Sequence, residues 1–217
     1  MITNLCFHGI GVNVNEREPG ESEYWVSVGV FKGILDEVVD RPNVTISFDD
    51  GNRSDVDIAL PELQDRKLSA TFFALAGRLR DPVSLSSTDL RELRNNGMGI
   101  GTHGWSHIPW RGLSRAATHR ELIDAREALS EASGGEIFDA ALPLGRYDRR
   151  LLSQLRDARY RTVFTSDRFR ARPGSWLQAR HSVTASDTVD SIRTLLTRHT
   201  SLSEARQVTA SLVKRVR

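Results

Sequence analysis

The sequence predicts an α/β protein with a parallel sheet, because short apolar runs alternate with amphipathic helical stretches over most of its 217 residues. The apolar runs are brief and unbroken, which is typical of strands buried on both faces of a parallel sheet. The expected strands are 44–48, 70–75, 98–102, 138–144, 162–165 and 179–183.

Four helices are expected between or after these strands, each beginning at a residue whose side chain can accept a hydrogen bond from the first turn. The predicted N-caps, in chain order, are Ser87 or Thr88, Ser114, Asp148 and Ser186. The first two helices are expected to end at Gly97 and Gly134, because glycine readily adopts the left-handed conformation that closes a helix. A last amphipathic stretch, 203–217, predicts a C-terminal helix that packs on the domain or on another copy of the chain.

The composition excludes several classes of protein. With 39% hydrophobic and 27% charged residues, the chain is neither collagen-like, coiled-coil nor disordered. Cys6 is the single cysteine, which excludes an internal disulfide and a cysteine-based zinc site. No apolar run is long enough for a membrane span, and the first ten residues do not resemble a secretory signal, so we expect a cytoplasmic protein.

The net charge of +2 is an average over two unlike halves. Residues 1–108 carry 10 basic and 16 acidic side chains, whereas residues 109–217 carry 20 basic and 12 acidic ones. Nine arginines fall in 146–172, largely on the flank of a predicted helix. We interpret this stretch as a solvated face and expect no nucleic-acid partner.

Acids and imidazoles follow several predicted strands at the point where each strand ends. Asp49 and Asp50 follow the strand 44–48, and His103 and His107 follow the strand 98–102. Because the carboxyl ends of parallel strands meet at one edge of the sheet, we expect these four side chains to lie close together.

This set of residue types suits a catalytic metal site. Two neutral imidazoles four residues apart can converge on one cation, and one carboxylate completes three protein ligands, which leaves a position for water. Only one of two neighbouring carboxylates needs to face the metal, so the other can accept a proton from the attacking water. The mixed donors favour Zn²⁺, and Co²⁺, Ni²⁺ or Fe²⁺ also fit. The sequence therefore predicts metal-assisted hydrolysis.

Several motifs resemble those of the polysaccharide deacetylases with the NodB-homology domain, carbohydrate esterase family four. The stretch 47–51 (SFDDG) resembles the first family motif, and 103–107 (HGWSH) is similar to the second, with its paired metal histidines. Between them, 70–73 (ATFF) matches a typical family strand. The stretch 142–145 (LPLG) resembles the third family motif. The stretch 7–10 (FHGI) is similar to a motif found near the start of the domain in many members. The resemblance extends from about residue 5 to about residue 183.

The resemblance implies a distorted (β/α)7 barrel with outer helices over 1–200, followed by the C-terminal helix 201–217. It implies removal of acetyl groups from an N-acetylated sugar, oligosaccharide or polysaccharide, with one divalent metal. Asp49 would be the general base, and Asp50, His103 and His107 the metal ligands. The backbone N–H of Leu144 would help to stabilise the oxyanion.

Two positions depart from the family pattern. Ala141 stands where the third motif usually has an arginine that holds the catalytic aspartate, and Arg180 is a candidate to replace it. The histidine of the fifth motif, which supplies the general acid, is missing, and His181 or His199 is the candidate. His119 is interpreted as a solvated helix residue.

The remaining site candidates are residues expected to line the substrate pocket. His8 follows the first strand, and Asp167 is near the acid that orients a histidine in other family members. The aromatic residues Trp105, Trp110 and Tyr147 could stack on a sugar ring or belong to the core. Two other functions remain open: a non-catalytic barrel that binds a glycan or a partner, and a hydrolase of a small non-sugar amide.

Overall fold

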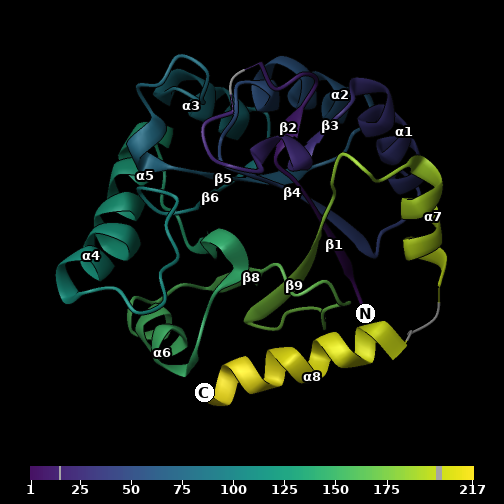
Figure 1. The fold of residues 1–217 in the computed structure, drawn as a ribbon. Helices are drawn as coiled ribbons and strands as arrows, with labels where there is room; N and C mark the ends of the chain where they lie inside the picture. The colour runs from purple at the N-terminus through teal and green to yellow at the C-terminus, as the bar shows by residue number, and fades with distance from the viewer. Residues whose placement is uncertain (15, 199–201) are drawn as a thin grey trace.

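A closed barrel of seven parallel strands forms the centre of the computed structural model, which describes residues 1–14, 16–198 and 202–217 (Figure 1). The strands are β1 (Thr3–Phe7), β4 (Val44–Asp49), β5 (Ala70–Ala74), β6 (Gly99–Thr102), β7 (Asp139–Ala141), β8 (Thr162–Thr165) and β9 (Leu177–Ser182). They pair in this order, and β9 pairs with β1 to close the barrel. A separate two-stranded sheet joins β2 (Gly9–Ile10) to β3 (Trp25–Val26).

Helices surround the barrel, as Figure 1 shows. They are α1 (Val28–Val38), α2 (Leu60–Asp65), α3 (Ser87–Asn95), α4 (Arg115–His119), α5 (Ala125–Ser133), α6 (Arg149–Asp157), α7 (Val189–Thr197) and α8 (Leu202–Val216). Two π-helical segments, Asp55–Ala59 and Arg120–Asp124, continue into α2 and α5. This architecture confirms the predicted (β/α)7 barrel with parallel strands and outer helices.

The strand predictions from apolar runs are confirmed for six of the seven barrel strands, with small shifts at their ends. Ser114 and Asp148 are N-caps as predicted, and Gly134 ends α5 in the left-handed conformation. The other two caps were predicted wrongly. Ser86 caps α3 and Thr188 caps α7, because each forms a reciprocal capping box with the third helical residue, Asp89 and Ser191 respectively.

A row of aromatic rings contributed by successive strands lies on the outer face of the barrel, against Phe31 of α1. Phe7, Phe48 and Phe72 stack with centroid distances of 5.5 and 4.6 Å, and all three are fully buried. Burial of such side chains is the main favourable contribution to folding of a barrel like this one. The rigid packing fixes the ends of β1, β4 and β5, where the polar residues begin.

The C-terminal helix α8 lies along the lower side of the molecule in Figure 1 and contacts α6. Ser211 on α8 is fully buried and shares a hydrogen bond of 2.8 Å with the Tyr147 hydroxyl. Lys214 Nζ donates to Asp167 Oδ1 at 2.6 Å. These contacts join the helix to the loops that follow β7 and β8.

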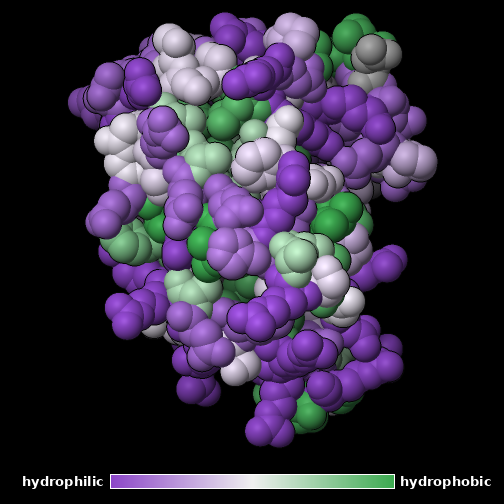
Figure 2. Space-filling model, turned by 90° about the vertical axis from the view of Figure 1, so that its left-hand side faces the viewer, coloured by the Kyte–Doolittle hydropathy of each residue, from purple (hydrophilic) through white to green (hydrophobic). Residues whose placement is uncertain are grey.

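The face formed by α4, α5 and α6 is largely hydrophilic, with small scattered groups of apolar side chains (Figure 2). Arg149, Arg150 and Arg156 belong to α6. Among the described residues no helix has the length and apolar character that crossing a membrane requires.

Candidate metal and catalytic centre

Asp49 and Asp50 lie at the carboxyl end of β4 and point in different directions. Asp49 is the last residue of the strand, and Asp50 adopts a left-handed conformation with φ 74°. Non-glycine residues rarely adopt this conformation, and it costs of order 1–3 kcal/mol, so it is typically found at functional sites. The turn directs Asp50 toward the two histidines and leaves Asp49 facing the barrel interior.

His103 and His107 lie in the loop after β6, with their rings 5.2 Å apart. His103 Nδ1 is 2.9 Å from the carbonyl oxygen of Ala141, so this contact orients the ring and leaves Nε2 toward the carboxylates. His107 also has a left-handed backbone, with φ 54°. Nε2 of His107 is 3.2 Å and Nε2 of His103 is 3.6 Å from the same oxygen, Oδ1 of Asp50.

A buried carboxylate that the sequence analysis did not identify, Glu121, holds the loop between the histidines. Its Oε2 accepts hydrogen bonds from the backbone N–H groups of Trp105, at 2.7 Å, and Ser106, at 3.3 Å. Gly104 has φ 90°, and a Cβ there would lie 2.5 Å from the same oxygen. Glycine at this position therefore allows the carboxylate to approach the loop backbone.

Asp50, His103 and His107 fit a divalent cation. Each offers one donor atom, and the three donors lie within 4.8 Å of one another. Oδ1 of Asp50 is buried and has no hydrogen-bond partner among the described residues, which is costly unless a cation satisfies it. Burial lowers the pKa of His103 to about 4, although Asp49 and Asp50 oppose this shift, so the imidazole is neutral and free to bind a metal at pH 7.

Asp49 forms a buried, bidentate ion pair with Arg180. Arg180 Nη1 donates to Oδ1 at 2.7 Å and Nη2 donates to Oδ2 at 2.6 Å. Burial alone would raise the pKa of Asp49, but the charge and hydrogen bonds of Arg180, together with the neighbouring imidazoles, outweigh burial and hold the pKa well below its ordinary value. The guanidinium also lies over the rings of Phe73 and Phe164, so the arginine is held on several sides.

A second unpredicted carboxylate, Glu18, contacts the far nitrogen of His107. Its Oε2 lies 2.6 Å from His107 Nδ1, and its Oε1 accepts from Arg78 at 2.5 Å. Glu18 belongs to the segment before the 3-10 helix Glu21–Tyr24, where no hydrophobic periodicity marks a structure. The cluster of acids in 16–23 was the one signal in the sequence.

A cavity of about 320 Å³ opens over these residues. Its lining includes His8, Glu18, Tyr24, Asp49, Asp50, Arg78, His103, His107, Leu144, Arg146, Ser166 and Arg180. Leu144 has φ 56° within the turn Pro143–Gly145, and its side chain is exposed. The His8 ring packs on Tyr24 with a centroid distance of 4.8 Å, and His8 Nδ1 is buried without a hydrogen-bond partner in the described part of the chain.

Four predicted site residues lie elsewhere. His181 follows Arg180 on β9, and since successive side chains of a strand point to opposite faces, its ring lies outside the barrel and lines a different cavity. Trp105 packs against the core under the Arg120 guanidinium, 4.5 Å from the ring centroid. Tyr147 is buried and donates to Asp167 at 2.6 Å, so both residues contact α8 rather than the cavity.

The other histidine and tryptophan candidates have simple roles. Trp110 is buried, and its Nε1 donates to Glu121 at 3.3 Å. His119 is exposed and lies 2.9 Å from Asp124, as expected for a solvated helix residue. His199 lies outside the described residues.

A barrel of seven parallel strands, with an Asp–Asp pair and two histidines where its strands end, defines the NodB type of fold. A family model described as polysaccharide deacetylase matches residues 36–163, which is more than half of the chain. The chain belongs to this family, and the resemblance inferred from the motifs is confirmed.

Known relatives cover the chain to different extents. YxkH of Bacillus subtilis, which carries the name of a polysaccharide deacetylase, is 24% identical over 143 residues, or 66% of this chain and 51% of that protein. The chain thus spans about half the length of this curated relative.

Solved structures share the fold at low sequence identity. The Streptococcus pyogenes deacetylase PplD in complex with acetate has a TM-score of 0.77 at 18% identity, over 91% of this chain and 98% of that one. IcaB from Ammonifex degensii has a TM-score of 0.72 at 22% identity, over 91% of this chain and 97% of that one. A family 4 carbohydrate esterase from Bacillus anthracis has a TM-score of 0.51 at 22% identity, over 70% of this chain and 72% of that one.

Proposed function

We propose that this protein is a metal-dependent hydrolase that removes N-acetyl groups from an N-acetylated carbohydrate. The observation that carries the proposal is the arrangement of two adjacent carboxylates with separate partners. Asp50 lies among the imidazoles of His103 and His107, while Asp49 is paired with Arg180. Membership of the polysaccharide deacetylase family supports the same reaction and a carbohydrate substrate.

Asp50, His103 and His107 hold the cation in this proposal. Two nitrogens and one oxygen suit Zn²⁺ best, and Co²⁺, Ni²⁺ and Fe²⁺ are also compatible. The bound cation would polarise the acetyl carbonyl and make a water molecule more acidic.

Asp49 accepts the proton of the attacking water at a carboxylate oxygen. Its distance of 3.9 Å from His103 Nε2 keeps it beside the ligand set without joining it. Arg180 is a positioning residue, because its two hydrogen bonds fix the carboxylate plane and keep Asp49 ionised. Arg180 thereby does the work of the family arginine whose position is taken by Ala141.

The backbone N–H of Leu144 stabilises the negative charge that develops on the acetyl oxygen. This role depends on where the N–H points, and the left-handed conformation of Leu144 is a specific and costly way to direct it. The exposed Leu144 side chain lies at the cavity and offers an apolar contact to the sugar.

His8 donates a proton to the departing amine. Among the imidazoles that line the cavity, His8 is the one outside the proposed ligand set, and its Nδ1 has no partner among the described residues. Asn52 Nδ2 donates to the His8 carbonyl at 2.9 Å, and Tyr24 packs on the ring, so the side chain is held in place. His8 replaces His181 in this role because His181 faces away from the cavity.

The proposal is tested by measuring acetate release from N-acetylglucosamine oligomers. We expect turnover with added Zn²⁺ or Co²⁺, and its loss on chelation. Metal bound at Asp50, His103 and His107 without turnover on any acetylated substrate would favour a non-catalytic binding barrel. Turnover of small acetamides but of no sugar would favour the non-sugar amide hydrolase.

A further inference from the structure

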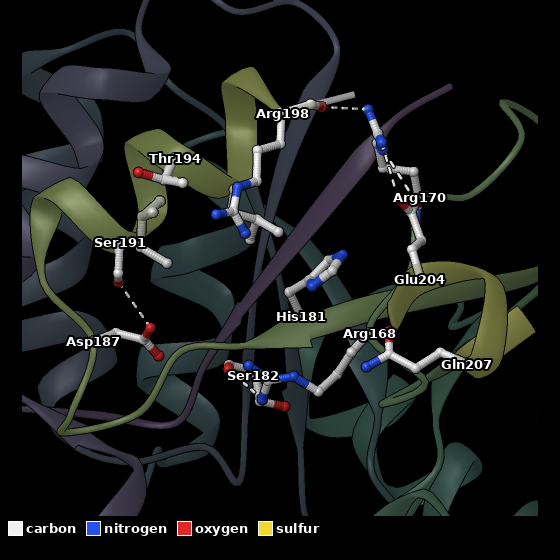
Figure 3. Close-up of a pocket in the computed structure, with 12 residues that line it drawn as sticks. Arg168, Arg170, His181, Ser182, Asp187, Ser191, Thr194, Arg198, Glu204 and Gln207 are labelled. Atoms are coloured by element: carbon white, nitrogen blue, oxygen red, sulfur yellow. Dashed lines mark hydrogen bonds and ion pairs between the residues drawn. The ribbon is translucent and has the colours of Figure 1, made fainter. Parts of the chain in front are cut away.

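A second cavity, of about 310 Å³, lies outside the barrel between β9, α7 and α8 (Figure 3). Its lining includes Arg168, Arg170, His181, Asp187, Ser191, Thr194, Arg198, Glu204 and Gln207. Ser182, at the end of β9, lines this cavity and the candidate catalytic cavity. A volume near 300 Å³ is at the small end of the range for small-molecule sites.

His181 is the buried polar group at the centre of this second cavity. Its side chain stands up from β9 between Arg198 and Arg170 in Figure 3, and only 7% of the residue is exposed. Nε2 is buried and has no hydrogen-bond partner among the described residues. An imidazole nitrogen left in this state is costly unless a ligand satisfies it.

The charges around His181 leave an excess of guanidinium groups. Glu204 is paired with Arg170 at 2.9 Å. The Asp187 carboxylate accepts from Thr184 and Ser191. Arg168 donates to the Ser182 carbonyl at 3.3 Å. Within the described part of the chain, neither Arg168 nor Arg198 has a carboxylate at ion-pair distance.

We propose that the second cavity is a binding site for a phosphate group, carried by a free phosphate ion or by a small phosphate monoester. Guanidinium groups bind phosphate oxygens by charge-assisted hydrogen bonds, and His181 adds a further donor. A cation is disfavoured because both carboxylates of the cavity already have partners. A wholly apolar ligand would leave two guanidinium groups without a counter-charge and the imidazole nitrogen without a hydrogen-bond partner.

Anion binding at this site couples to protonation of His181. Burial and then the charge of Arg168 lower the pKa of the free imidazole to about 4. The other charged groups facing the ring are Arg170 from the β8–β9 loop, Asp187 from the β9–α7 loop, Arg198 at the end of α7 and Glu204 from α8. A bound dianion favours the imidazolium, so its affinity rises as pH falls. Sulfate is the suitable probe of this coupling, because its charge does not change between pH 5 and pH 8.

The test is calorimetric titration of the full chain with inorganic phosphate, with a hexose 6-phosphate and with sulfate. We expect Arg198→Ala and Arg168→Ala to weaken binding about tenfold or more, since each removes a charge-assisted hydrogen bond. Arg206→Ala, which removes an exposed arginine of α8 outside the cavity lining, is the matched control and should bind as the wild type does. His181→Gln should abolish the pH dependence of sulfate binding.

The outcomes separate the two sources of the phosphate group from failure of the proposal. Equal affinity for inorganic phosphate and the sugar phosphate indicates a site for the free ion, and much tighter binding of the ester indicates a phosphorylated ligand. Absence of binding by all three probes, or equal binding by the Arg198→Ala and Arg206→Ala variants, overturns the proposal. Because binding is measured directly, these results do not depend on deacetylase activity.

Discussion

Arg180 on β9 holds both carboxylate oxygens of Asp49 on β4, at 2.7 and 2.6 Å, across the width of the intervening strand β1. The motif resemblance implies an arginine for this role at the position of Ala141 on β7. In this chain the arginine that pairs with Asp49 comes instead from β9 of the same barrel, and both side chains are almost fully buried.

The first prediction concerns this pair. Arg180→Met should lower kcat for acetate release at least about 100-fold, because Asp49 loses the group that orients it. It should also destabilise the fold by about 3–5 kcal/mol, since an unpaired carboxylate remains buried. Arg180→Lys keeps the charge but not the bidentate geometry, so it should recover stability more fully than activity. Equal recovery of both in urea unfolding and kinetic assays would contradict a positioning role.

The second prediction separates the two neighbouring aspartates. Asp49→Asn should keep normal metal content and lose about 10²–10⁴-fold in kcat/KM, because the general base is removed. Asp50→Asn should instead lose metal, since it removes the carboxylate from the ligand set. Metal analysis by mass spectrometry and kinetics at saturating Zn²⁺ distinguish the two. Loss of metal from Asp49→Asn would show that the assigned roles are wrong.

The fold and the convergence of Asp50, His103 and His107 follow from local signals in the sequence, whereas the residues that support this cluster do not. Apolar runs mark the strands, and residues at strand ends converge because parallel strands share a direction, which explains why Asp50 and His103 could be predicted. Arg180 was identified by the same argument. His181 was expected in the same cavity but lines another one, because the end of a strand does not reveal which of two adjacent side chains faces inward.

Glu18 and Glu121 illustrate a different limit. Glu18 contacts His107 from a segment 89 residues away in the chain, whereas Glu121 follows Trp105 by 16 residues, and neither carboxylate belongs to a recognisable motif. Their partners are set by how loops and helices pack around the barrel, which one sequence does not specify. Only the three-dimensional arrangement distinguishes these carboxylates from the many solvated ones.

The third prediction concerns Glu18 as the support of a metal ligand. Glu18→Gln should weaken zinc binding about 10–100-fold, because a carboxylate at the far nitrogen of a ligating imidazole orients the ring and increases its basicity. Turnover at saturating metal should change much less. Glu23→Gln, an exposed acid of the same segment, is the control for the loss of one negative charge. Competition with a zinc-binding dye measures the affinities, and equal values for both variants would count against the role of Glu18.

The fourth prediction tests His8 as the proton donor. His8→Gln should lower deacetylation of an N-acetylated sugar about 10²–10⁴-fold, because an amine leaves poorly without a proton. An aryl acetate has a leaving group that needs no proton, so its hydrolysis should fall far less. His119→Gln, at an exposed helix position, controls for loss of an imidazole. Equal losses on both substrates would indicate a structural role for His8.

The fifth prediction concerns Asp55, a fully buried carboxyl whose two oxygens have no hydrogen-bond partner among the described residues. Burial, reinforced by the charges of Asp50 and Asp49, raises its pKa well above 3.8. The folded state therefore holds a proton that the unfolded state releases near pH 4. Stability conferred by this proton is present below that pH and declines as pH rises toward the folded-state pKa.

Asp55→Asn removes this titration while keeping the shape of the side chain. The variant should be more stable than the wild type by about 1–3 kcal/mol at pH 8, because no charge has to be buried, and the difference should shrink toward pH 4. Urea unfolding of metal-free protein between pH 4.5 and pH 8 measures this difference. Asp57→Asn, an exposed neighbour paired with Arg53, should show no comparable trend. A stability difference that does not vary with pH would mean that Asp55 is ionised in the fold and has found a compensating partner.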